Sequence, residues 1–118
     1  MKGRLADIHF DRHGDIVVGA LEGDIDSSNA RELLSALSAG VPAQARGLIL
    51  DVSALHYLDS AGIEMIFSLA DRLRNRRQRL GIVIPAEAPV ARVLNISGVE
   101  SVAAVADSVD AVLSALAG

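Results

Sequence analysis

The sequence predicts an α/β fold, with one mixed, mostly parallel β-sheet and helices packed against it. Short apolar, β-branched runs alternate with segments of helical periodicity, which is the pattern of βαβ units. Hydrophobic residues make up 51% of the 118 residues, enough for a sizeable core. The core must be mostly aliphatic, because the chain has two Phe, one Tyr and no Trp. Length alone predicts a single domain over residues 1–118.

The first segment predicts a β-hairpin. Leu5, Ile8 and Phe10 alternate weakly, and a second apolar run covers residues 16–21. Residues 11–15 between them have the composition of a turn. The hairpin is expected to place an antiparallel strand at one edge of the sheet.

A helix should follow this hairpin. Residues 26–29 are all of types that favour helix N-caps, and Gly40 supplies a stop. Between them, apolar side chains recur at helical spacing: Ala30, Leu33, Leu34 and Leu37.

The middle of the chain predicts a buried strand and a long helix. The continuous apolar run over residues 47–52 is typical of a strand covered on both faces. Residues 53–59 are expected to form a connector, and the helix should run from Ser60 to Arg79. The buried stripe expected on this helix consists of Ile63, Ile66, Phe67, Ala70 and Leu73.

The last third completes a ββαβαβαβα order. A buried strand over residues 80–84 ends at Pro85, and Pro89 suits the first turn of a short helix. A strand over residues 102–105 and a final helix are expected next. Strands separated by helices imply parallel neighbours joined by right-handed crossovers. The final helix should bury Val109, Val112, Leu113 and Leu116.

Composition excludes several classes of function. A net charge of −4 and scarce aromatics argue against direct nucleic-acid binding. The chain has no Cys, and its three His show no zinc spacing, so neither a metal nor a cofactor is expected. There is no signal-peptide pattern and no apolar run of the roughly 20 residues that span a bilayer. These features predict a cytoplasmic protein, and we expect a monomer.

Two polar segments follow predicted strands, where open α/β sheets carry functional groups. They are residues 22–26 and residues 56–62. In the second, either Asp59 or Ser60 could cap the long helix. A hydroxyl at this position is accessible, and a phosphate placed there would meet unpaired N–H groups and a positive dipole end. Ser60 is therefore a candidate switch residue.

A family resemblance supports this hypothesis. Residues 50–63, LDVSALHYLDSAGI, resemble the signature of the STAS domain (sulfate transporter and anti-sigma factor antagonist) in its antagonist branch. GDID at residues 23–26 and ISGV at residues 96–99 resemble two further elements of the family. The similarity spans about residues 6–117, with the elements in the family's order.

The resemblance implies partner switching in transcription regulation and stress response. Ser60 matches a serine phosphorylated by an anti-sigma factor that is also a serine kinase. The unphosphorylated form binds that partner and so frees a sigma factor, and a serine phosphatase resets the cycle.

The residues expected around this site are polar or small. Ala61 stands where relatives often have a second hydroxyl. Apolar surface around Ile63, Met65 and Ile66 could add to docking, although Met65 is better read as core. The site next to Ser60 is expected to contain Asp24, Asp26, Asp59, Ala61, Gly62 and Ile63.

Other functions remain as alternatives. An unregulated adaptor or scaffold subunit, in a stress-signalling or transporter complex, would have the same fold. A receiver domain needs a late lysine, but the only lysine is Lys2. A hydrolase using Ser60 with His56 as base lacks the G-x-S-x-G motif, so we expect no enzyme activity. Five arginines between Arg72 and Arg79 form a solvated helix face or a contact for an acidic partner.

Overall fold

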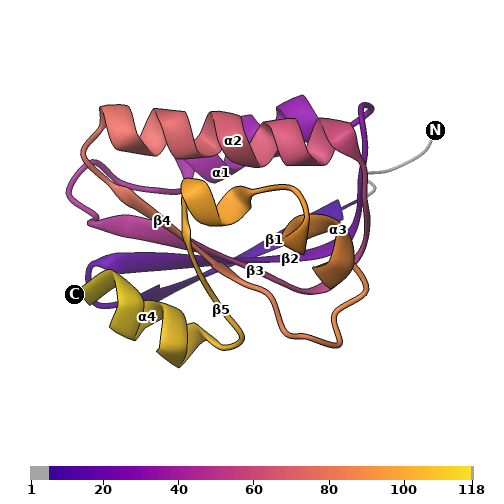
Figure 1. The fold of residues 1–118 in the computed structure, drawn as a ribbon. Helices are drawn as coiled ribbons and strands as arrows, with labels where there is room; N and C mark the ends of the chain where they lie inside the picture. The colour runs from indigo at the N-terminus through magenta and orange to yellow at the C-terminus, as the bar shows by residue number, and fades with distance from the viewer. Residues whose placement is uncertain (1–5, 118) are drawn as a thin grey trace.

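The computed structural model describes residues 6–117, so the predicted role of Leu5 in the hairpin lies outside the described residues. These residues form a five-stranded sheet in the order β1-β2-β3-β4-β5 (Figure 1). β1 is antiparallel to β2, and the other neighbours are parallel. The predicted fold class is confirmed. The strands are β1 (Ala6–His13), β2 (Ile16–Ile25), β3 (Gly47–Leu58), β4 (Arg79–Val83) and β5 (Ala104–Ala106).

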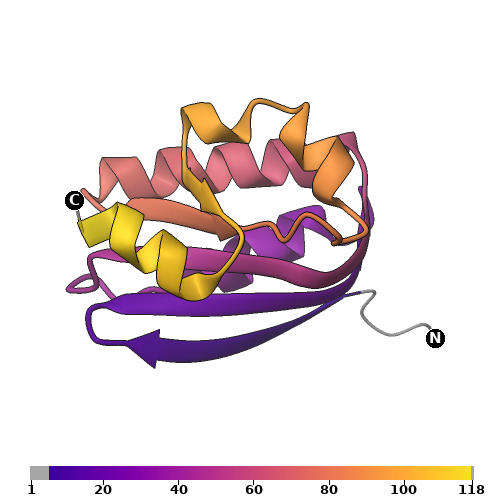
Figure 2. The same cartoon turned by 60° about the horizontal axis from the view of Figure 1, so that its bottom comes forward.

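The helices lie on both faces of the sheet, as Figures 1 and 2 show. Because the sheet grows strand by strand in one direction, right-handed crossovers place the connecting helices on the same face. The last helix follows β5 and packs on the other face, mainly against β4 and β5. Figure 2 shows that it does not extend over β1. On β2, Val18 is buried in the cluster that α4 covers. The helices are α1 (Ala30–Ala39), α2 (Ser60–Asn75), α3 (Ala91–Asn95) and α4 (Val109–Ala117), with a 3-10 turn at Val99–Ser101.

Two apolar clusters hold these layers together. The larger lies between the sheet and α1 and α2, and the smaller lies under α4. β3 serves both clusters: Leu48 and Leu50 belong to the larger, and Ile49 belongs to the smaller. All three side chains are fully buried. This explains why residues 47–52 form a continuous apolar run.

Three strands extend beyond their predicted ends. β2 continues to Ile25 and β3 to Leu58, where they pair with each other after two register irregularities. The predicted loop at residues 22–26 and connector at residues 53–59 are therefore largely strand. Of residues 53–58, only Leu55 and Leu58 are buried, so the exposed residues give this segment the composition of a loop. β1 likewise continues to His13.

The long helix ends earlier than predicted, at Asn75 rather than Arg79. The N–H of Gln78 donates to the carbonyl of Leu73 at 2.8 Å, and the N–H of Arg77 donates to the carbonyl of Arg74 at 3.0 Å. These two bonds form a Schellman motif, whose left-handed position is usually glycine. Here it is Arg77, with φ of 61°, so the sequence carried no stop signal.

The buried face of α2 and the last strand also differ from prediction. Ile63 and Phe67 are only half-buried. The contact with α1 turns the buried face toward Met65 and Leu69. β5 covers residues 104–106, because the 3-10 turn at Val99–Ser101 continues into a turn at residues 102 and 103.

Arg77→Gly should stabilise the protein. Glycine removes the strain of a left-handed arginine, which outweighs the extra freedom of the unfolded chain, so the free energy of unfolding should rise by about 0.5–1 kcal/mol. Arg72→Gly is the matched control, because Arg72 is an exposed residue inside the same helix. It should lower that free energy by about 1 kcal/mol. Urea unfolding would measure both, and a loss of stability in both would contradict this view of the helix end.

Candidate functional site

The two polar segments predicted to carry function meet at one end of the sheet. Residue 25 pairs with residue 58 at the carboxyl ends of β2 and β3. The N–H of Asp59 then donates to the carbonyl of Ile25 at 3.4 Å. This brings the turn after β2 beside the start of α2, at the right-hand end of the view in Figure 1. The two loops therefore form one continuous surface.

Asp59 is the N-cap of α2. It has extended backbone angles, and its Oδ1 accepts from the N–H groups of Ala61 at 2.9 Å and Gly62 at 3.4 Å. Its own carbonyl accepts from the N–H of Ile63 at 3.1 Å. The sequence left the cap open between Asp59 and Ser60, and the structure assigns it to Asp59. The expectation that a phosphate would meet unpaired N–H groups is thus wrong for Ala61 and Gly62.

Ser60 occupies the first position of α2 and is exposed. Its hydroxyl makes no hydrogen bond to any other described residue. Because Asp59 caps the helix, the Ser60 hydroxyl is not needed as a cap for the N-terminus of α2. It is therefore available for chemistry from outside the molecule.

Gly62 allows α2 to begin directly above the ends of β2 and β3. A Cβ atom at this position would lie 2.8 Å from Cγ of Leu58 and 3.2 Å from Cγ2 of Ile25. Real Cβ atoms do not approach a neighbour as closely as the first of these distances. The absence of a side chain at Gly62 therefore sets the height of Ser60 above the sheet.

Asn29 organises the loop after β2, a role that the sequence did not reveal. Its side chain is 4% exposed. Oδ1 accepts from the N–H of Asp26 at 3.0 Å, and Nδ2 donates to the carbonyl of Asp24 at 2.9 Å. Asp26 in turn accepts from the N–H and hydroxyl of Ser28, at 2.8 and 2.6 Å. In the sequence, Asn29 was one of four similar capping residues, and nothing singled it out.

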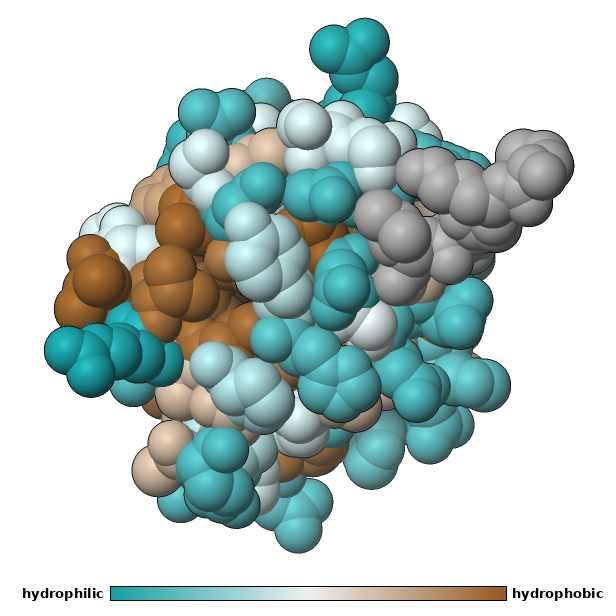
Figure 3. Space-filling view, turned by 90° about the vertical axis from the view of Figure 1, so that its right-hand side faces the viewer, coloured by the Kyte–Doolittle hydropathy of each residue, from teal (hydrophilic) through white to brown (hydrophobic). Residues whose placement is uncertain are grey.

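Of the three apolar residues expected to add to docking, only Ile63 is partly accessible. Met65 and Ile66 are buried, so the interpretation of Met65 as a core residue is confirmed and a docking contact by Ile66 is wrong. Apolar character near the site comes instead from Ile96, just after α3, which is 79% exposed. Figures 1 and 2 place α3 at the same end of the molecule as the start of α2. Figure 3 shows apolar side chains gathered on one side of this end.

A shallow groove of about 300 Å³ runs between α1 and α2 beside this site. Ser27 and Arg31 lie on its α1 side, and Ala61 and Glu64 lie on its α2 side. Ala61 directly follows Ser60, so the groove opens next to the candidate switch residue.

Known proteins resemble this chain along most of its length. The family model of the STAS domain matches residues 7–112. The chain belongs to the STAS domain family. A relative from Bordetella bronchiseptica, BtrV, is provisionally named an anti-sigma factor antagonist and is 31% identical over 106 residues, covering 90% of each chain. The predicted resemblance to the antagonist branch is confirmed.

Solved structures of STAS relatives share the fold. An anti-sigma factor antagonist from Mycobacterium paratuberculosis is 23% identical, with a TM-score of 0.82 over 96% of this chain and 95% of its own. The antagonist SpoIIAA in its unphosphorylated form is 16% identical, with a TM-score of 0.68 over 95% of this chain and 99% of its own. At these identities, the likeness establishes the STAS fold of this chain.

Other site types find no support among residues 6–117. This part of the chain holds no group of three or more His, Asp or Glu residues that could bind a metal ion. None of its helices is both long and apolar enough to cross a membrane. His56 is exposed on β3 rather than placed in a loop beside Ser60.

The five arginines between Arg72 and Arg79 differ in the contacts they make. Arg76 donates to the carbonyl of Ser38 in the last turn of α1 and to that of Val41 just after the helix, and Arg79 donates to the carbonyl of Leu116. Arg74 forms an exposed ion pair with Asp71. Only two of the five arginines, Arg72 and Arg77, have no such contact with a described residue. Much of this cluster therefore holds chain segments together.

Two substitutions at Asp59 should distinguish the effect of its capping oxygen on stability from the effect of its negative charge. Asp59→Ala removes the acceptor for two N–H groups and should lower the free energy of unfolding by about 1 kcal/mol. Asp59→Asn keeps an acceptor oxygen and should leave that free energy within about 0.5 kcal/mol of wild type. Urea unfolding at pH 7 would compare the three proteins. Equal losses in both variants would contradict the cap assigned here.

Proposed function

We propose that this protein is an anti-sigma factor antagonist whose binding to its partner is controlled by phosphorylation of Ser60. The observation that carries this proposal is the exposed Ser60 hydroxyl, which has no hydrogen bond to the rest of residues 6–117 because Asp59 caps the helix. Membership of the STAS family and the name of the BtrV relative support it. The unphosphorylated form named for SpoIIAA points to phosphorylation in that relative.

The proposed switch is electrostatic. A phosphate adds about −1.5 to −2 charge at pH 7. Asp59 already binds two N–H groups of the first turn, and Asp24 and Asp26 lie at the end of the neighbouring strand. The helix therefore neutralises little of the added charge. Burying that charge in an interface without matching cations costs several kcal/mol, which would weaken binding on the order of a thousandfold.

The partners of this proposal are those that the family resemblance implies. An anti-sigma factor with serine kinase activity binds the unphosphorylated surface and releases its sigma factor. It transfers the γ-phosphoryl group of ATP to the Ser60 oxygen, takes up the hydroxyl proton and releases ADP. A serine phosphatase hydrolyses the phosphoserine and restores binding. The protein acts here as a monomeric cytoplasmic binding module rather than as an enzyme, and needs no cofactor of its own.

Ser60 should be the phosphate acceptor. The purified protein would be incubated with labelled ATP and the kinase-like anti-sigma factor of the same genome. Ser60→Ala should abolish labelling, because it removes the accepting oxygen. Ser68→Ala is the matched control, an exposed serine further along the same helix, and it should be labelled as wild type is. Labelling of the Ser60→Ala variant at wild-type strength would show that the acceptor lies elsewhere.

A charge at Ser60 should release the partner. Ser60→Asp should weaken binding to the same anti-sigma factor about a hundredfold or more, less than a phosphate because it carries a single charge. Ser60→Ala should bind as wild type does. Calorimetric titration would give the affinities. Undiminished binding by Ser60→Asp would remove the switch and leave the unregulated adaptor as the function.

The exposed Ile96 is proposed as an apolar anchor for the partner. Burying an isoleucine side chain contributes about 1.5–3 kcal/mol, so Ile96→Ser should weaken binding about ten- to a hundredfold. Because the side chain is 79% exposed, the melting temperature should hardly change. Unchanged affinity in a folded Ile96→Ser variant would place the interface away from α3.

A further inference from the structure

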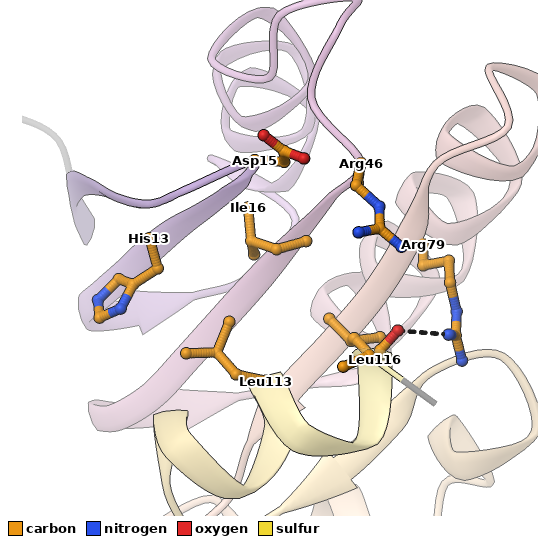
Figure 4. A pocket seen from close by; sticks show the side chains of 8 residues that line it. His13, Asp15, Ile16, Arg46, Arg79, Leu113 and Leu116 are labelled. Atoms are coloured by element: carbon orange, nitrogen blue, oxygen red, sulfur yellow. Dashed lines mark hydrogen bonds between the residues drawn. The ribbon is translucent and has the colours of Figure 1, made fainter.

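A second concave site lies at the other end of the sheet from Ser60. α4 packs mainly against β4 and β5, and it meets β2 only at Val18 and Ile16. Near the amino ends of β2 and β4, this leaves a pocket of about 290 Å³ (Figure 4). Its lining comes from the hairpin turn, the segment before β3, the start of β4 and the last turns of α4.

The lining combines an apolar surface with a cationic side. Ile16, Leu113 and Leu116 supply the apolar part, and Arg46 and Arg79 supply two guanidinium groups. Figure 4 shows both arginines on one side of the pocket, with Ile16 and Leu113 across from them. A lining of this kind suits a ligand with one apolar end and one anionic end.

Arg46 and Arg79 have hydrogen-bond donors that no described residue accepts. One nitrogen of Arg79 donates to the carbonyl of Leu116 at 2.8 Å, which leaves its other donors available. The Arg46 side chain makes no hydrogen bond or ion pair with a described residue. Asp15 is the only carboxylate among the lining side chains. The pocket is thus locally cationic on a chain whose net charge is −4.

We propose that this pocket binds a small amphiphilic monocarboxylate. Its carboxylate would accept hydrogen bonds from Arg46 and Arg79, and its hydrocarbon part would lie on Ile16, Leu113 and Leu116. A cavity of about 150 Å³ holds benzene, so the present volume suits a chain of roughly eight carbons. This site is separate from the proposed phosphorylation site and does not depend on it.

Octanoate is the probe for this proposal, with 1-octanol and inorganic phosphate as matched controls for charge and tail. Each would be titrated into the full-length ¹⁵N-labelled protein and followed by amide NMR. Octanoate should shift signals of residues 13–16, 46, 79 and 113–117. It should bind at least tenfold more tightly than either control, since a hydrogen bond to a charged group contributes about 1.5–3 kcal/mol. Equal binding of 1-octanol or phosphate would overturn the proposal.

Variants at Arg46 complete the test. Arg46→Gln should weaken octanoate binding about tenfold, and Arg46→Lys should retain part of it. Arg72→Gln removes the same charge from an exposed position on α2 and should change nothing. Wild-type affinity in Arg46→Gln, or octanoate shifts centred on residues 56–66, would overturn the proposal. Both Arg46 variants should fold, because this side chain is exposed and has no described partner.

Discussion

The cap that Asp59 places on α2 is the interaction on which the functional site depends. It fixes where the helix begins, directly above the paired ends of β2 and β3. Because Asp59 provides the cap, Ser60 does not, and its hydroxyl is exposed. Because the cap is itself a carboxylate on the first N–H groups, a second anion at Ser60 finds little compensation there. Asp59 therefore both fixes the start of α2 and makes the site sensitive to an added negative charge at Ser60.

The sequence predicted the features that have strong local signals. The apolar run of β3 and the capped periodicity of α1 identified their elements, and the motif around Ser60 identified the family. Prediction failed where tertiary contacts decide. β2 and β3 lengthen because they pair with each other, while the α2 boundary is hidden by an arginine in a glycine position. The role of Asn29 depends on two backbone groups brought together only by folding.

The sheet separates two surfaces of different chemistry. Its carboxyl end carries acidic and apolar groups around Ser60, which suit a regulated protein contact. Its amino end carries the arginine-lined pocket beside α4. Among the arginines over residues 72–79, Arg79 lines this pocket and also donates to the carbonyl of Leu116, whereas Arg76 donates to carbonyls at the end of α1 and just after it. These arginines therefore stabilise local structure through hydrogen bonds to backbone carbonyls.

In the proposed switch, the phosphate on Ser60 acts on the partner through its charge and leaves the fold of this protein unchanged. Amide NMR spectra of the unphosphorylated protein and the protein stoichiometrically phosphorylated on Ser60 test this directly. Shifts confined to residues 24–29 and 56–66, with α4 and β4 unchanged, are the predicted result. Shifts spread through the sheet and α4 would contradict it, because they would show that modification rearranges the domain.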